Sequence, residues 1–235
     1  VRSLSRRGAP APGAGGHAGA GVCYLRGDVH SGAGLVEAVD GVDVIVHAAT
    51  SLRRSRAVEV EGTTNMVSAA AAVGAHLIYV SIVGVDAMSF AYYRAKDAAE
   101  KAVVAGGAAW TIQRATQFHD LIDRLLGWRL FPATRHTAFQ PVDTLDVSTR
   151  LADLVEAGPS GRVDDIGGPA VVPIRELAAT RRRITGAGTV IVPAPAIGAF
   201  KDFDAGRHLT PDHADGRVTW EQWLRSRGGA LPGTG

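Results

Sequence analysis

The sequence predicts an α/β fold, and three observations lead to this prediction. Short apolar runs of strand length recur along the 235 residues, at positions 22–25, 42–46, 77–81, 110–113 and 190–192. Segments long enough to form helices separate most of these runs. Glycines mark the points where several of those segments end. Because parallel strands need long crossover connections, the alternation predicts a doubly wound, largely parallel sheet.

The first half of the chain supplies most of these elements. The opening VRSLSRR predicts the end of a strand, and residues 8–21 are a Gly/Ala/Pro segment with too little apolar bulk to pack. Its GAGGHA stretch satisfies the pattern G-x-G-x-x-A of dinucleotide-binding turns. We interpret it as a loop, because another strand follows it and no helix begins there. GTTNMVSAAAAVGAH predicts a crossover helix that ends at Gly74, and SFAYYRAKDAAEKAVVAGG predicts the next helix, ended by Gly106 and Gly107.

The regular alternation loosens after about residue 140. PVDTLDVSTRLADLVEAG predicts a helix with an extended lead-in, and RVDDIGG predicts a short strand. Ligands of open α/β sheets bind outside the carboxyl ends of the strands. We therefore expect a nucleotide-binding core over residues 1–142 and a small C-terminal region over residues 143–235 that covers the substrate side.

Composition excludes several classes of protein. Charged residues make up 20% of the chain and the formal net charge is +2, so nothing predicts the basic field of a nucleic-acid-binding protein. No apolar run reaches the length of a membrane span, and no secretory signal opens the sequence. Cys23 is the only cysteine and lies in the apolar stretch VCYL, which predicts a buried thiol in a reducing compartment. We expect a cytoplasmic protein with a small-molecule substrate and neither a nucleic-acid nor a membrane partner.

The clearest chemical signal is Tyr92, four residues before Lys96 in AYYRAKDAAEK. On a helix these side chains share one face, and a nearby cation favours the phenolate by lowering the pKa of the tyrosine. Tyr92 would then exchange a proton with a carbonyl or alcohol substrate. The spacing alone is common, and the alternative is an ordinary surface pair.

The order of several short motifs resembles the short-chain dehydrogenase/reductase superfamily, in particular its atypical, NmrA-like NAD(P)H-binding branch. The matching stretches are VRSLSRR, RGDV, VIVHAAT, VEGTTN, YVSIVGVD, YYRAK, WTIQRATQFHD, QPVDTLDV and LTPDHADGRVTWEQWL. Together they extend over nearly the whole chain. The resemblance implies a Rossmann-like fold and NADP as cofactor, with NAD less favoured.

The resemblance also assigns residues to the nucleotide. It implies that Ser5 and Arg6 hold the 2′-phosphate of NADP, whereas the alternative is a solvated charged loop. Asp28 and Val29 match the contact to the adenine edge, and the alternative for Asp28 is a turn residue. The small side chains that would let the cofactor lie against the sheet are Ala48 and Ala49.

The catalytic residues that the resemblance implies are Tyr92, Lys96 and Ser81, with Lys96 also holding the nicotinamide ribose. Ser81 is either a group that polarises the substrate carbonyl or a structural hydroxyl. Glu59 stands where relatives carry Asp or Asn, which puts the supporting polar residue in question. Thr116, with Arg114 and Gln117, follows a strand and would line the nicotinamide pocket; the alternative is a capping threonine at a helix start.

The histidines and two of the tryptophans do not predict a further site. The eight histidines do not cluster at metal spacing, so no metal site is predicted. Trp220 and Trp223 at helical spacing are more typical of packing than of a cofactor site.

Relatives carry a strand, a Gly-rich turn and a helix before the strand that ends like VRSLSRR. We expect these elements to be missing here, so that the strands ending at Arg6 and His47 lack the neighbour between them. The sequence thus favours an NADP-dependent oxidoreductase, with a non-catalytic redox sensor or a copy unable to bind cofactor as alternatives. A homodimer is compatible with the sequence.

Overall fold

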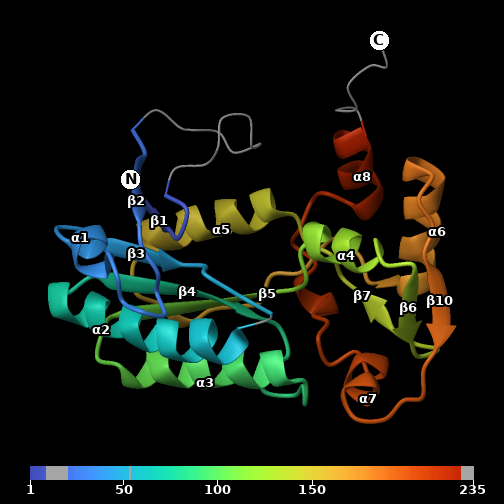
Figure 1. Cartoon of the computed structure of the whole chain (residues 1–235), viewed down its shortest axis with the longest axis horizontal. Coiled ribbons are helices and arrows are strands. Elements are labelled where there is room, and N and C mark those ends of the chain that lie inside the picture. Colours follow the sequence, from blue (N-terminus) through green and yellow to red (C-terminus); the bar gives the residue numbers. More distant parts are fainter. Residues whose placement is uncertain (9–20, 53, 229–235) are drawn as a thin grey trace. The chain divides into compact units, whose positions relative to one another are not determined.

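The computed structural model describes residues 1–8, 21–52 and 54–228 (Figure 1). The chain forms two compact units that interleave along the sequence: unit 1 comprises residues 1–80, 95–112 and 157–161, and unit 2 comprises residues 81–94, 113–156 and 162–235. The functional division expected at residue 142 stays a prediction. The GAGGHA segment lies outside the described residues.

Most residues of a four-stranded sheet, in the order β3-β4-β5-β8, lie in unit 1. Its strands are β3 (Val44–His47), β4 (His76–Ile82), β5 (Trp110–Ala115) and β8 (Gly161–Arg162). β3 and β4 pair in parallel, and every residue of β4 is buried. A central parallel strand is covered on both faces, which explains why the sequence of β4 is nearly continuous in apolar residues.

Helices pack on this sheet through one apolar cluster. α2 (Thr63–Val73) and α3 (Ala91–Ala105) run along the same face of the sheet (Figure 1), and Val67, Ala70 and Val103 pack with Leu77 and Tyr79 of β4. α2 ends as predicted at its C-cap Gly74, whose φ of 71° lies in the left-handed region that glycine adopts without strain. A π-helix, η1 (Arg56–Gly62), precedes α2.

The first two strands form a sheet of their own. β1 (Arg2–Ser5) pairs in parallel with β2 (Cys23–Arg26), and α1 (Leu35–Val39) follows. Among the described strands, neither β1 nor β2 pairs with β3. The guanidinium of Arg2 donates to three carbonyl oxygens at the end of α1, Glu37, Ala38 and Asp40, where a cation suits the helix dipole.

Unit 2 is built from short elements around a second apolar cluster. Its helices are α4 (His119–Leu125), α5 (Thr144–Ala157), α6 (Ile174–Thr185), α7 (Ala199–Asp204), α8 (Trp220–Gly228) and the 3₁₀ turn η2 (Pro211–His213). Its strand pairs are β6 (Leu130–Ala133) with β10 (Val190–Pro193), in parallel, and β7 (Ala138–Phe139) with β9 (Val172–Pro173), antiparallel. Trp220 and Trp223 stack in this cluster with ring centroids 5.4 Å apart, which confirms their packing role.

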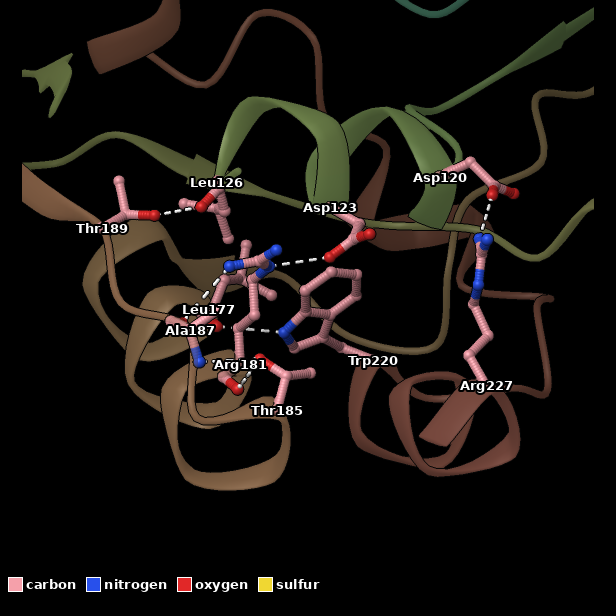
Figure 2. A network of polar contacts seen from close by, with 10 residues as sticks. All are labelled: Asp120, Asp123, Leu126, Leu177, Arg181, Thr185, Ala187, Thr189, Trp220 and Arg227. Carbon is pink, nitrogen blue, oxygen red and sulfur yellow. Dashed lines mark hydrogen bonds and ion pairs between the residues drawn. The ribbon is translucent and has the colours of Figure 1, made fainter. Parts of the chain in front are cut away.

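Polar contacts hold α4, α6 and α8 together within unit 2 (Figure 2). Arg181 of α6 donates to Asp123 of α4 at 2.7 Å, and the indole N–H of Trp220 donates to the Leu177 carbonyl of α6 at 3.0 Å. Arg227 of α8 also pairs with Asp120 of α4. The cationic end of α6 is therefore partly ion-paired.

One sequence prediction is wrong, and several strands were not predicted. Cys23 is exposed, because β2 has a strand partner on one side only among the described strands, so the prediction of a buried thiol is wrong. The pattern also missed β6, β7 and β9, whose two to four residues are too few to show a period. No helix in the described part of the chain is long and apolar enough to cross a membrane.

Candidate active site

Lys96 is the most strongly constrained of the predicted site residues. Its side chain is only 4% exposed, and its Nζ lies 3.0 Å from Oε2 of Glu59 and 2.9 Å from the carbonyl oxygen of Val80. The ammonium also lies over the ring of Tyr79, 4.6 Å from the centroid. Burial lowers the pKa of Lys96, and the carboxylate of Glu59 opposes that shift. The lysine is thus held by a buried partner from η1.

Glu59 is fully buried and its carboxylate is held from two directions. Oε1 accepts the hydroxyl of Thr50 at 2.7 Å and the backbone N–H of Ser51 at 2.9 Å, while Oε2 faces Lys96. π-Helical turns widen a helix locally and often occur at functional sites. Sequence analysis noted Glu59 as a departure from relatives; the structure shows it paired with Lys96. The valines on either side of it were the only sequence signal.

His47 completes this polar group at the end of β3, and sequence analysis missed it. Its Nε2 lies 3.1 Å from the hydroxyl of Thr63, and its ring lies 5.5 Å from that of Tyr79. Burial, with a smaller contribution from the charge of Lys96, lowers the pKa of His47 to about 3. The imidazole is therefore neutral at physiological pH. A histidine that ends an apolar strand was the only sequence signal.

Tyr92 lies in the first turn of α3, on the same helix as Lys96 and four residues before it. Its ring is half-buried and meets the ring of Tyr93 edge-on, with centroids 6.0 Å apart. Tyr93 is buried, accepts a hydrogen bond from the amide of Gln117 at 3.2 Å, and has its pKa raised by burial. Of the two tyrosines, Tyr92 is the one with access to solvent.

Ser81 follows Val80 near the end of β4. Its hydroxyl is buried and has no hydrogen-bond partner among the described residues. A buried hydroxyl without a protein partner costs free energy unless another group satisfies it. This orphan oxygen is compatible with a ligand contact, although its role as a catalytic group stays a prediction.

The residues expected to contact the adenosine half of the cofactor differ in exposure and in the hydrogen bonds that they already make. Arg6 is exposed after β1, and the hydroxyl of Ser5 donates to the carbonyl of Gly8 at 2.9 Å. Asp28 accepts the backbone N–H of His30 at 2.9 Å, as in an Asx turn, which favours its turn interpretation. Val29 is half-buried against the cluster of unit 1.

The structure also shows the exposure of the alanines after β3 and the contacts of the polar residues at the end of β5. Ala48 is exposed and Ala49 is half-buried, directly after β3. Thr116 does not cap a helix: its hydroxyl donates to the Gln140 carbonyl at 2.5 Å, and α4 begins only at His119. Arg114 is paired with Asp86 at 3.2 Å, and its side chain is nearly buried.

The residues described so far can be tested against a dinucleotide. Lys96 donates one N–H of its ammonium to the Val80 carbonyl and forms an ion pair with Glu59, and an ammonium has three N–H donors, enough to serve a ribose hydroxyl as well. Arg6 is exposed and forms no ion pair among the described residues, so its guanidinium can pair with a phosphate, and Ala48 offers a surface without bulk. The donors and the open surface fit a dinucleotide, while Asp28 already serves its own turn.

Residues 1–139 match the family described as NAD(P)H-binding. The chain belongs to this family. No curated protein sequence matches it. This match confirms the predicted NAD(P)H-binding family, and similar solved structures confirm the predicted Rossmann-like α/β fold.

Solved structures similar to this member of the NAD(P)H-binding family include reductases and epimerases. A triphenylmethane reductase from Citrobacter sp. has a TM-score of 0.70 and 15% identity, over 90% of this chain and 84% of that one. An NADPH-dependent quinone oxidoreductase from Escherichia coli, complexed with NADPH, has a TM-score of 0.68 and 16% identity, over 88% and 84%. The enzyme WbmH from Bordetella bronchiseptica, in complex with NAD⁺, has a TM-score of 0.64 and 14% identity, over 85% and 78%. At these identities the likeness establishes the fold alone.

Proposed function

We propose that the protein is an NADP-dependent oxidoreductase that reduces a small carbonyl substrate or oxidises the corresponding alcohol. Its family binds NAD(P)H, and two structures of the same fold belong to NADPH-dependent or dye-reducing enzymes. The observation that carries the proposal is the start of α3, where a half-buried tyrosine precedes a fixed ammonium by one helical turn. A surface tyrosine and lysine pair would not need a buried carboxylate to hold the lysine.

Each residue has a part in this proposal. Hydride donation is the chemistry that NADPH supplies when it is bound. Tyr92 gives its phenolic proton to the substrate oxygen as negative charge develops there, and takes it back in the reverse direction. Lys96 donates an N–H to the nicotinamide ribose and favours the phenolate. Ser81 donates its orphan hydroxyl to the substrate oxygen.

The preference for NADP rests on Arg6. A guanidinium forms charge-assisted hydrogen bonds with a phosphate, and the exposed side chain leaves those donors available. The hydroxyl of Ser5 supplements this contact if it turns from the Gly8 carbonyl. Ala48 and Ala49 let the cofactor lie against the sheet.

One observation favours a second function, that of a non-catalytic NAD(P)H-binding redox sensor. Lys96 is almost inaccessible and has a carboxylate partner at 3.0 Å, so its charge is already balanced within unit 1. A lysine kept for structure alone would look the same.

Turnover of NADPH separates these functions. Binding is measured by calorimetry with NADPH, and turnover by loss of absorbance at the nicotinamide band with a panel of quinones, aldehydes and ketones. We expect Tyr92→Phe to keep the dissociation constant for NADPH and to lower turnover by about 10²–10⁴-fold, the usual contribution of a general acid. Tyr93→Phe is the matched control and keeps its turnover. Tight binding without turnover of any compound would favour the sensor, and unchanged turnover in Tyr92→Phe would refute the assigned proton donor.

A further inference from the structure

A groove runs between α6 and the neighbouring strand β10 in unit 2, and none of the residues that line it belongs to the candidate active site. The groove has a volume of about 540 Å³, within the range of ligand-binding pockets. Residues that line it are Arg175, Ala178, Ala179, Arg182, Arg183, Thr189 and Ile191. We propose that it binds an extended, acidic segment of a partner protein, which adds as a strand to the outer edge of β10.

One wall of the groove is a single stripe of α6. Arg175, Ala178, Ala179 and Arg182 are spaced at i, i+3, i+4 and i+7, so they share one face of the helix. The two alanines have small side chains, so the middle of this helix face leaves room for a ligand. The arginines stand at its two ends, separated along the helix axis by about 10 Å, which is the rise of seven residues. An extended chain covers the same distance in about three residues.

The other wall is an edge strand. Val190 and Ala194 donate their backbone N–H groups to Arg129 and Ala133 on the β6 side. Because successive amides of a strand point in opposite directions, the N–H and C=O of Ile191 face the other edge, where no described strand pairs with β10. Val190 is 58% exposed on this edge strand. Unpaired backbone groups of this kind can accept an added strand.

The position of β10 is fixed by contacts within unit 2. The hydroxyl of Thr189 donates to the Leu126 carbonyl, and Arg181 donates to the carbonyl of Ala187 at 3.2 Å (Figure 2). These bonds hold the short segment between α6 and β10. The groove is therefore formed before any partner binds, which lowers the entropic cost of docking.

Charge selects the occupant. Within the described part of the chain, neither Arg175 nor Arg182 takes part in an ion pair, whereas Arg183 is partly neutralised by Glu221 at 3.0 Å. Two unpaired cations at the ends of the groove favour glutamate or aspartate side chains. A second copy of this chain would bring the same arginines face to face across the paired strands, and like charges oppose that arrangement.

Fluorescence anisotropy of the full chain with a defined peptide tests the proposal. The probe is a fluorescein-labelled decapeptide of alternating glutamate and valine. We expect it to bind in the micromolar range, more weakly as salt is raised, and to slow hydrogen exchange at the amide of Ile191. Arg175→Glu and Arg182→Glu should each weaken binding by about tenfold or more. Arg135→Glu, at an exposed arginine outside the groove, is the matched control and should bind as the wild type does.

Three results would overturn the proposal. Equal binding of a peptide that alternates lysine and valine would remove the charge argument. Equal binding of a glutamate peptide with a central proline, without protection of Ile191, would indicate an anion site that needs no strand pairing. Dimers in sedimentation, together with protection of Ile191 that rises with protein concentration in the absence of peptide, would assign the groove to a second copy. Because both arginines are exposed, their variants should keep the wild-type circular dichroism spectrum.

Discussion

Replacing Glu59 with glutamine should destabilise the protein by leaving the charge of Lys96 buried and unpaired. Glu59 is fully buried, the lysine side chain is 4% exposed, and their charged atoms lie 3.0 Å apart. Breaking such a pair from one side typically costs about 3–5 kcal/mol of unfolding free energy. For a chain of this size each kcal/mol corresponds to about 2–4 °C, so Glu59→Gln should lower Tm by about 6–20 °C at pH 7.

The pH dependence identifies the charge as the cause. Burial lowers the pKa of Lys96 in the folded state, and Glu59 partly offsets this. Between the folded pKa and the unfolded value of about 10.4, the unfolded chain binds more protons, so stability rises with pH across that window. Without Glu59 the folded-state pKa of Lys96 is lower still, so the window begins at lower pH. The gap in stability between Glu59→Gln and the wild type should therefore narrow as pH is raised from about 7 to 10.

Urea denaturation followed by circular dichroism, at several pH values, measures this gap. Asp97→Asn is the matched control, since it removes a carboxylate from an exposed ion pair with Lys101 on the same helix and should change stability by less than about 0.5 kcal/mol. The double variant Glu59→Gln/Lys96→Met removes both charges and should regain most of the loss. A Tm of Glu59→Gln close to that of the wild type at pH 7, or a gap independent of pH, would refute the reasoning.

Three further predictions concern single positions. Arg6→Ala should reduce the preference for NADPH over NADH by about ten- to a hundredfold, the value of a charge-assisted hydrogen bond; calorimetry with both cofactors checks this, and an unaltered ratio would contradict it. Because the pKa of His47 is lowered to about 3, its contribution to stability is present above about pH 6.5 and lost as pH falls toward 3. His47→Gln should flatten the acid limb of stability against pH by up to about 1.4 kcal/mol per pH unit, as urea denaturation would show. A Cβ at Gly106 would lie 1.9 Å from Cγ1 of Val67, so Gly106→Ala should cost about 1–3 kcal/mol and be partly rescued by Val67→Ala in thermal melts.

The sequence predicted those elements whose pattern is long enough to show a period. β4 and α2 matched expectation because one carries a continuous apolar run and the other an alanine-rich body with a glycine stop. β7 and β9 have two residues each and are defined by their pairing, which no local pattern encodes. Cys23 shows a related limit, since its exposure depends on which strands pair beside β2.

The candidate site also combines residues that the sequence predicted with residues that it did not. The spacing of Tyr92 and Lys96 was visible because both lie on one helix, where neighbours along the chain are also neighbours in space. The partner of the lysine was not visible, because Glu59 comes from η1, more than thirty residues earlier, and only the fold brings the two together. His47 escaped notice for the same reason.

The pairing of Lys96 with Glu59 changes what the motif means for catalysis. In the sequence, the lysine is a cation free to act on Tyr92 and on a ribose. In the structure, a carboxylate at 3.0 Å balances much of its charge, and the carbonyl of Val80 accepts one N–H. The electrostatic effect of the ammonium on the phenol must then be weaker than that of a lone cation, since the opposite charge lies beside it. Under the proposed function, the activity of Tyr92 depends on Glu59 as well as on Lys96, and the proposed dinucleotide site shares its buried ion pair with the stability of unit 1.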